Sequence, residues 1–243
     1  MSTDVVTKRI TETSPRLKAR MVGVLYLLMV SLGGLVQFAR GRLVVKGDAA
    51  ATAINILAHE PLFRLAFAAD VLVVACSIAV TALFYSLFKP VNRSVSLLAA
   101  FFGLVGGTIQ GFACLFEFAP LVVLGGTQHA SVFDVGQLQA LAYMFLKLYS
   151  PAYGIALVFF GFQFLLIGYL TFKSTFLPRI LGVLMAFSGV GWLTFLSPSF
   201  GAKYLFPYIL TADIGEASLV LWLLVFAVNE QRWREQAGAA GEW

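Results

Sequence analysis

Charged residues are scarce in this sequence. They make up 12% of its 243 residues, about half of the roughly 25% found in soluble domains. Hydrophobic residues reach 60% and include 23 phenylalanines. A composition this poor in charge excludes an ordinary soluble domain and indicates a protein whose solvent is largely lipid.

The residues that most often hold cofactors are also few. The two histidines, His59 and His129, fall in predicted loops, so no histidine pair spans the core to ligate a haem. The two cysteines, Cys76 and Cys114, lie in apolar runs without a CxxC pattern and are expected to be small core residues. The sequence has no HExxH, GxSxG or glycine-rich phosphate-loop motif. We therefore expect neither a cofactor nor a metal.

The formal net charge of +5 does not indicate a nucleic-acid partner. Lysine and arginine lie between apolar runs and at the N-terminus, and no basic face is interleaved with aromatic residues. Such a distribution is typical of the positive-inside pattern of membrane proteins. The expected partner is a lipid bilayer, with no nucleic acid.

Long apolar runs dominate the chain, and six of them suffice to cross a bilayer as helices, which takes about 20 residues. The predicted spans are Met21–Ala39, Leu62–Phe88, Val95–Leu124, Ala152–Phe172, Ile180–Leu196 and Leu205–Val228. The predicted fold class is therefore all-α, an integral membrane bundle of six transmembrane helices. Residues 1–20 are predicted to form a flexible N-terminus, residues 21–229 the transmembrane domain and residues 230–243 a polar tail.

Two short helices are expected outside the membrane, both on the outer side. Asp48 is placed to cap the run AAATAINILAHE, whose apolar residues share one face. Asp134 and Gln137 resemble a capping box that opens the helix QLQALAYMFLKL. Pro151 is predicted to break this second helix before the fourth span begins.

The distribution of lysine and arginine predicts the orientation. The N-terminus, the two basic turns KPVNR and KSTFLPR and the tail hold 11 of the 17 basic residues. The positive-inside rule therefore places both termini in the cytoplasm.

Small residues mark the third span as a packing surface. Gly103, Gly107 and Gly111 recur at a spacing of four, which lets another helix approach closely. This seam could also join two copies of the chain, so a homo-oligomer through the third span is expected. Pro120 should bend the same span.

Four acids lie inside predicted spans, at a similar estimated depth in the outer half of the bilayer. We predict that they form a polar intramembrane cluster with two basic residues; its members are Asp70, Glu117, Asp213, Glu216, Arg64 and Lys147. Four further polar residues are predicted to line a pocket there: Tyr149, Tyr153, Gln110 and Gln163. Ionisable groups inside a membrane are costly, so they face protein or water and are candidates for function. The alternative is that these acids only tie helices together.

Several segments together resemble the bacterial domain-of-unknown-function family 4386. The segments are Gly47–Asp70, Lys89–Arg93, Gln137–Ala142, Gly154–Leu170, Phe176–Leu184 and Gly215–Leu224. The resemblance covers roughly residues 20–229 and implies a multi-pass protein of the bacterial inner membrane, without an assigned activity. Asp70 and Glu216 match acids of the family. Relatives often carry histidine near Tyr149 and Gln163, and this departure argues against a metal or proton relay in the fourth span.

Three functions remain open at this point. The first is binding or transport of a small solute, proton-linked transport included, through an acidic cavity open to the outer side. The second is an intramembrane enzyme that acts on a lipid or isoprenoid by carboxylic acid–base chemistry. The third is a structural or regulatory membrane subunit. Whether the chain is an enzyme is left undecided by its residues.

Overall fold

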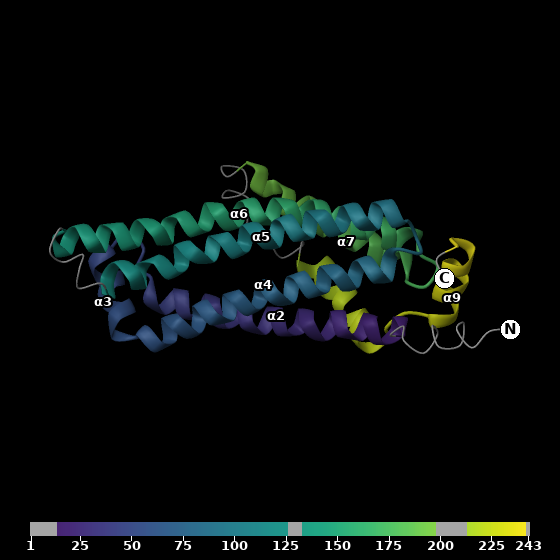
Figure 1. The fold of residues 1–243 in the computed structure, drawn as a ribbon, viewed down its shortest axis with the longest axis horizontal. Helices are drawn as coiled ribbons and strands as arrows, with labels where there is room; N and C mark the ends of the chain where they lie inside the picture. The colour runs from purple at the N-terminus through teal and green to yellow at the C-terminus, as the bar shows by residue number, and fades with distance from the viewer. Residues whose placement is uncertain (1–13, 126–132, 198–212, 242–243) are drawn as a thin grey trace, which may run out of the picture.

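The computed structural model describes residues 14–125, 133–197 and 213–241, and these are overwhelmingly helical (Figure 1). The helices are α2 (Pro15–Leu43), α3 (Ala49–Ala58), α4 (Glu60–Phe88), α5 (Arg93–Gly125), α6 (Val135–Lys173), α7 (Arg179–Leu193) with a 3₁₀ turn (Thr194–Leu196), and α9 (Glu230–Ala239). Residues 213–225 form a further helix. Within the described part, five helices are long and apolar enough to cross a membrane: α2, α4, α5, α6, and α7 with its 3₁₀ turn.

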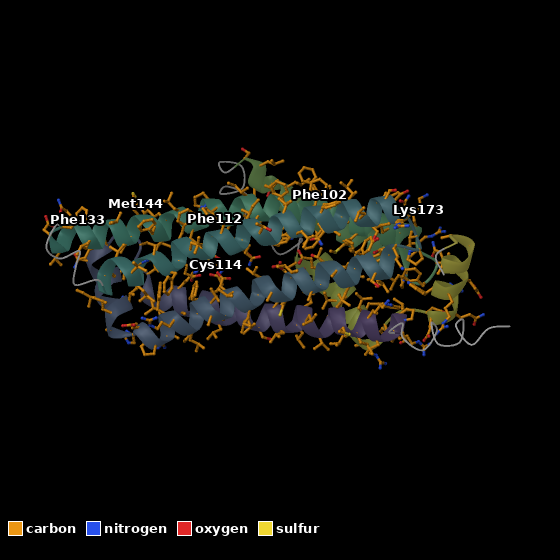
Figure 2. The ribbon with its side chains drawn as sticks, viewed as in Figure 1. Phe102, Phe112, Cys114, Phe133, Met144 and Lys173 are labelled. Atoms are coloured by element: carbon orange, nitrogen blue, oxygen red, sulfur yellow. The ribbon has the colours of Figure 1, made fainter. Side chains whose placement is uncertain are left out.

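The long helices run side by side along the length of the molecule (Figure 1). α2 packs on α4, α4 on α5, α5 on α6, and α6 on α7. α3 lies at one end of the bundle and α9 at the other (Figure 1); these are called the α3 end and the α9 end below. Large apolar side chains cover the outer faces (Figure 2), with Phe112 and Met144 exposed by 59% and 50%. Such a surface suits contact with acyl chains.

Helix starts follow the predicted capping residues. The Asp48 carboxylate accepts from Ala51 N at 2.8 Å and caps α3. Asp134 and Gln137 form the predicted capping box at the start of α6. Ser14 caps α2, whose first residue is Pro15, ahead of the predicted start at Met21. Residues 15–20, which the predicted domain division placed in the N-terminal segment, are therefore part of α2.

Pro151 does not break its helix. α6 continues through it for 39 residues, so the predicted second outer helix and the fourth span are one element. A proline removes one backbone hydrogen bond and crowds the preceding turn. In membrane helices neighbouring helices can offset that loss. Here Pro151 lies on the exposed face while α6 packs against both α5 and α7. Of the two short helices expected outside the membrane, only α3 is a separate helix in the described part of the chain.

The glycines of the third span face helices of the same chain. A Cβ added at Gly103 would collide with the Gln163 side chain of α6. A Cβ at Gly107 would contact Ser77 Oγ of α4 at 3.4 Å. The seam is therefore filled by intramolecular packing, and the homo-oligomer contact stays a prediction.

The polar tail folds back onto the bundle instead of extending away from it. α9 begins at an Asn229 cap and buries Trp233, whose indole donates to the carbonyl of Leu87 at 2.8 Å. This carbonyl belongs to the last turn of α4, where no intrahelical donor is available. Arg16 near the start of α2 lies 3.8 Å from Glu230 in the first turn of α9. The start of α2 and the tail helix therefore lie at the same end of the molecule.

Candidate functional site

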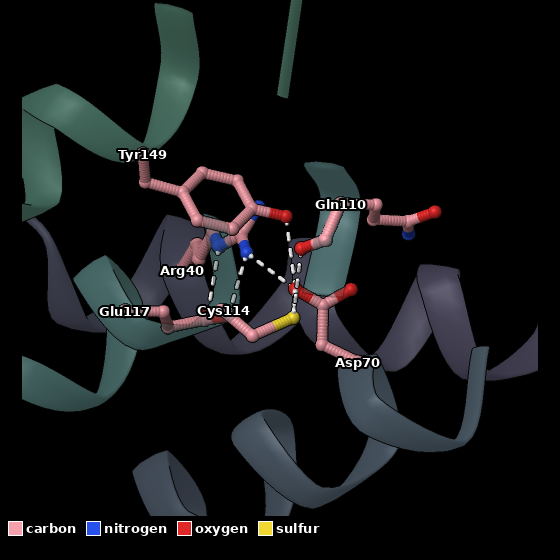
Figure 3. A network of polar contacts seen from close by, with 6 residues as sticks. All are labelled: Arg40, Asp70, Gln110, Cys114, Glu117 and Tyr149. Carbon is pink, nitrogen blue, oxygen red and sulfur yellow. Dashed lines mark hydrogen bonds and ion pairs between the residues drawn. The ribbon is translucent and has the colours of Figure 1, made fainter. Parts of the chain in front are cut away.

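A buried network of charged and polar side chains joins α2, α4, α5 and α6 near the α3 end (Figure 3). Its centre is Arg40, in the last turn of α2. Arg40 Nε donates to Glu117 Oε1 at 3.0 Å, and Nη2 lies 2.9 Å from Glu117 Oε2. The same Nη2 donates to Asp70 Oδ2 at 3.2 Å. One guanidinium thus holds two carboxylates from different helices.

The network is largely closed to its surroundings. The side chains of Glu117 and Asp70 are 2% and 7% exposed, against 23% for Arg40. Tyr149 covers the guanidinium, with its ring centroid 3.8 Å from Arg40 Cζ, and its hydroxyl donates to Asp70 Oδ2 at 2.9 Å. Cys114 Sγ lies 3.7 Å from the same oxygen. The network holds one base and two acids, so it is short of positive charge. A buried charge without a partner is costly.

Arg40 was not among the predicted members, and the two predicted bases lie elsewhere. Arg64 pairs with Glu60 at 2.6 Å on an exposed face of α4, away from Asp70. Lys147 Nζ lies 4.9 Å from the ring centroid of Tyr143. Arg40 directly follows the first apolar run, a position that indicates an interfacial residue. The signal that could have found it is the tilt of helical side chains toward the N-terminus, which carries a long side chain back into the bundle.

Glu216 forms a second polar centre, separate from Arg40. Its carboxylate accepts hydrogen bonds from the Tyr26 hydroxyl of α2 and the Trp192 indole of α7. At 1.5 Å per residue, Asp70 lies about 27 Å from the α9 end along α4, while Tyr26 and Trp192 lie about 16 and 20 Å from it. The four acids therefore do not share one level. Asp213 is exposed, one helical turn before Glu216, and interacts electrostatically with it.

A cavity of about 210 Å³ connects the two centres. Arg40, Asp70, Tyr26, Trp192 and Glu216 all line it. All four predicted pocket residues line it as well: Tyr149, Tyr153, Gln110 and Gln163. The remaining wall is mostly apolar and includes Val73, Val80, Phe84, Leu157, Phe160 and Phe164. The cavity thus combines an aromatic and aliphatic wall with a few fixed polar groups, which is the usual make-up of a small-molecule site.

Two amides in this cavity differ in their bonding. Gln163 donates to Thr81 Oγ1 at 3.1 Å. Gln110 is 3% exposed, and within the described chain its side-chain amide has no hydrogen-bond partner. Figure 3 shows this amide turned away from the Arg40 network. Since Gln110 lines the cavity, the donor and acceptor of its amide are available to a water or ligand there.

The arrangement offers acid–base and ion-binding chemistry. No group of three metal-ligating side chains is found among residues 14–125, 133–197 and 213–241. What the cavity does present is a guanidinium, two carboxylates, three amides and several aromatic hydroxyls. These groups can bind charge, donate and accept hydrogen bonds, and carry protons.

An all-helical bundle with several apolar spans and an internal charged network defines a multi-pass membrane protein. Residues 21–227 match the family described as a domain of unknown function, DUF4386, and the chain belongs to this family. A protein from Archaeoglobus fulgidus, described as uncharacterized, is 23% identical over 154 residues, which cover 63% of this chain and 78% of the relative. No solved structure matches the chain.

Proposed function

We propose that this protein binds a small solute in the cavity between its two polar centres and passes it across the bacterial inner membrane. The observation that carries the proposal is the cavity itself, which joins Asp70 and Arg40 to Glu216 inside an otherwise apolar bundle. Its volume of about 210 Å³ exceeds that of a protein cavity of about 150 Å³ known to take up benzene. A ligand of one ring and a short substituent would fit.

The proposed topology has six spans with both termini in the cytoplasm. α7 and its 3₁₀ turn lead toward the α3 end, while Arg16 and Glu230 bring α9 beside the start of α2. The described helix of residues 213–225 packs on α7 at Gly215 and on Gly23 of α2 through Leu224, and so returns along the bundle toward α9. This return is the proposed sixth crossing, and the basic turns support a cytoplasmic α9 end.

A pair of valines on α4 tests whether the cavity is a binding site. Val73 lines the cavity, whereas Val71 is 45% exposed on another face. Val73→Phe should fill part of the cavity and weaken binding of benzyl alcohol at least tenfold, because the ring occupies the space of the ligand. Binding is measured by equilibrium dialysis with radiolabelled benzyl alcohol and purified protein in detergent.

Val71→Phe is the matched control and should bind as the unchanged protein does. Equal binding by both variants would contradict the proposal, since ligand would then associate with the outer surface. Exchange of the same label across proteoliposome membranes, above the rate of empty vesicles, distinguishes transport from binding alone.

A further inference from the structure

Glu216 is the cavity acid without a described basic partner. Tyr26 and Trp192 donate one hydrogen bond each to its two oxygens. No lysine or arginine among the described residues forms an ion pair with it. Asp70, in contrast, lies 3.2 Å from Arg40 Nη2. A carboxylate that accepts hydrogen bonds from two neutral donors inside an apolar bundle has no positive charge opposite it among the described residues. A cation from outside the protein can therefore pair with it.

The surroundings of Glu216 favour an organic cation over a simple metal ion. Metal ions of the hard type need several oxygen ligands around them, and the described residues contain no group of three His, Cys, Asp or Glu side chains that could hold such an ion. The cavity wall instead carries aromatic rings, those of Trp192, Tyr153 and Phe160 among them. Aromatic faces attract ammonium groups, most strongly where water is excluded.

We propose that Glu216 is the subsite for the ammonium group of a small aromatic or cyclic amine, whose apolar body lies in the cavity. This inference rests on the proposed function, because it names the substrate class of the same site. The unpaired amide of Gln110 supports a bound ligand independently of Glu216, as it is 3% exposed and lines the same cavity. Asp70 already pairs with Arg40, so the charge of a ligand is expected to be recognised by Glu216.

Two probes of equal size test the inference, benzylamine and benzyl alcohol. They share the ring and the chain length and differ in the charge of the terminal group. Equilibrium dialysis near neutral pH should give a dissociation constant at least tenfold lower for benzylamine in the unchanged protein. Glu216→Gln should remove this preference, because the amide keeps the shape of the side chain and loses its charge.

Two further variants complete the design. Glu60→Gln removes an exposed acid on α4 and should keep the full preference for the amine. Tyr26→Phe removes one donor to Glu216 and leaves the carboxylate in place, so the preference should persist or increase. Melting temperatures of all variants are measured alongside.

The outcomes separate the inference from the function beneath it. Equal affinity for both probes, unaffected by Glu216→Gln, would overturn the ammonium subsite while leaving a solute-binding cavity. Loss of both probes in Glu216→Gln at an unchanged melting temperature would also overturn it, since Glu216 would then shape the cavity rather than recognise charge. Absence of binding for both probes, with Val73→Phe indistinguishable from the unchanged protein, would overturn the proposed function itself.

Discussion

At the α3 end of the bundle, Arg40 Nη2 lies 2.9 Å from Glu117 and 3.2 Å from Asp70. Arg40→Met keeps an unbranched side chain and removes the guanidinium with its charge, so two buried carboxylates lose their base. Breaking a buried pair in this way costs about 3–5 kcal/mol in soluble proteins. We expect a loss of this order in the free energy of unfolding, measured by titration with SDS.

Arg64 supplies the matched control for Arg40. Its pair with Glu60 is exposed, with 57% and 42% of the two side chains accessible. Exposed pairs contribute about 0–1 kcal/mol, so Arg64→Met should be nearly neutral. In the double variant Arg40→Met with Glu117→Gln, part of the lost stability should return, because one uncompensated charge is gone. Similar losses for Arg40→Met and Arg64→Met would show that the network does not stabilise the fold.

At the scale of helices, the contact between α6 and α7 is set by close backbone approach. A Cβ at Gly168 would lie 2.6 Å from Ala186 N and 2.8 Å from the carbonyl of Gly182. Backbone atoms cannot move aside as a flexible side chain can, so Gly168→Ala should force the helices apart. Overpacking of this kind costs about 1–3 kcal/mol. Thermal unfolding in detergent should show a lower midpoint.

Gly34 on α2 provides the opposite case. It has nothing within 4 Å of an added Cβ, so alanine meets no obstacle there. Alanine is the better helix former by up to about 1 kcal/mol. Gly34→Ala should therefore leave the midpoint unchanged or raise it. A decrease as large as that of Gly168→Ala would mean that helix separation is not the cause.

Hydrophobic run length predicted the second, third and fifth spans closely and the polar contacts poorly. α4 and α5 begin within two residues of the predicted positions and end at or beside the predicted residues. The reason is that a helix that crosses the hydrocarbon core of a bilayer needs an unbroken apolar run. Pro151 misled the prediction, since its effect depends on neighbouring helices that no local pattern records. The partner of Asp70 depends on the direction of a long side chain, and so Arg64 was preferred to Arg40.

The depth of each acid was also only partly predictable from the sequence. Counting residues along a helix gives a level from the end of its own span, whereas the offset between spans is fixed by packing. Glu216 shows this, because Gly215 packs closely on Leu184 and Ser188 of α7 and places the next residue beside Trp192. Asp70 is held at another level by Tyr149 and Arg40. One predicted cluster thus became two centres joined by a cavity.

For the whole molecule, the number of crossings decides where the tail lies. Lys46 is exposed between α2 and α3, and Glu235 is exposed on α9 at the opposite end. If residues 197–229 cross the membrane, the two positions lie on opposite sides. A membrane-impermeant maleimide should therefore label Lys46→Cys in intact spheroplasts, and Glu235→Cys only after permeabilisation. The unchanged protein, with Cys76 and Cys114 inside apolar helices, sets the background. Labelling of both positions in intact spheroplasts would indicate five crossings and contradict a cytoplasmic tail. The contact between Arg16 and Glu230 argues against five crossings, because it holds the tail beside the start of α2.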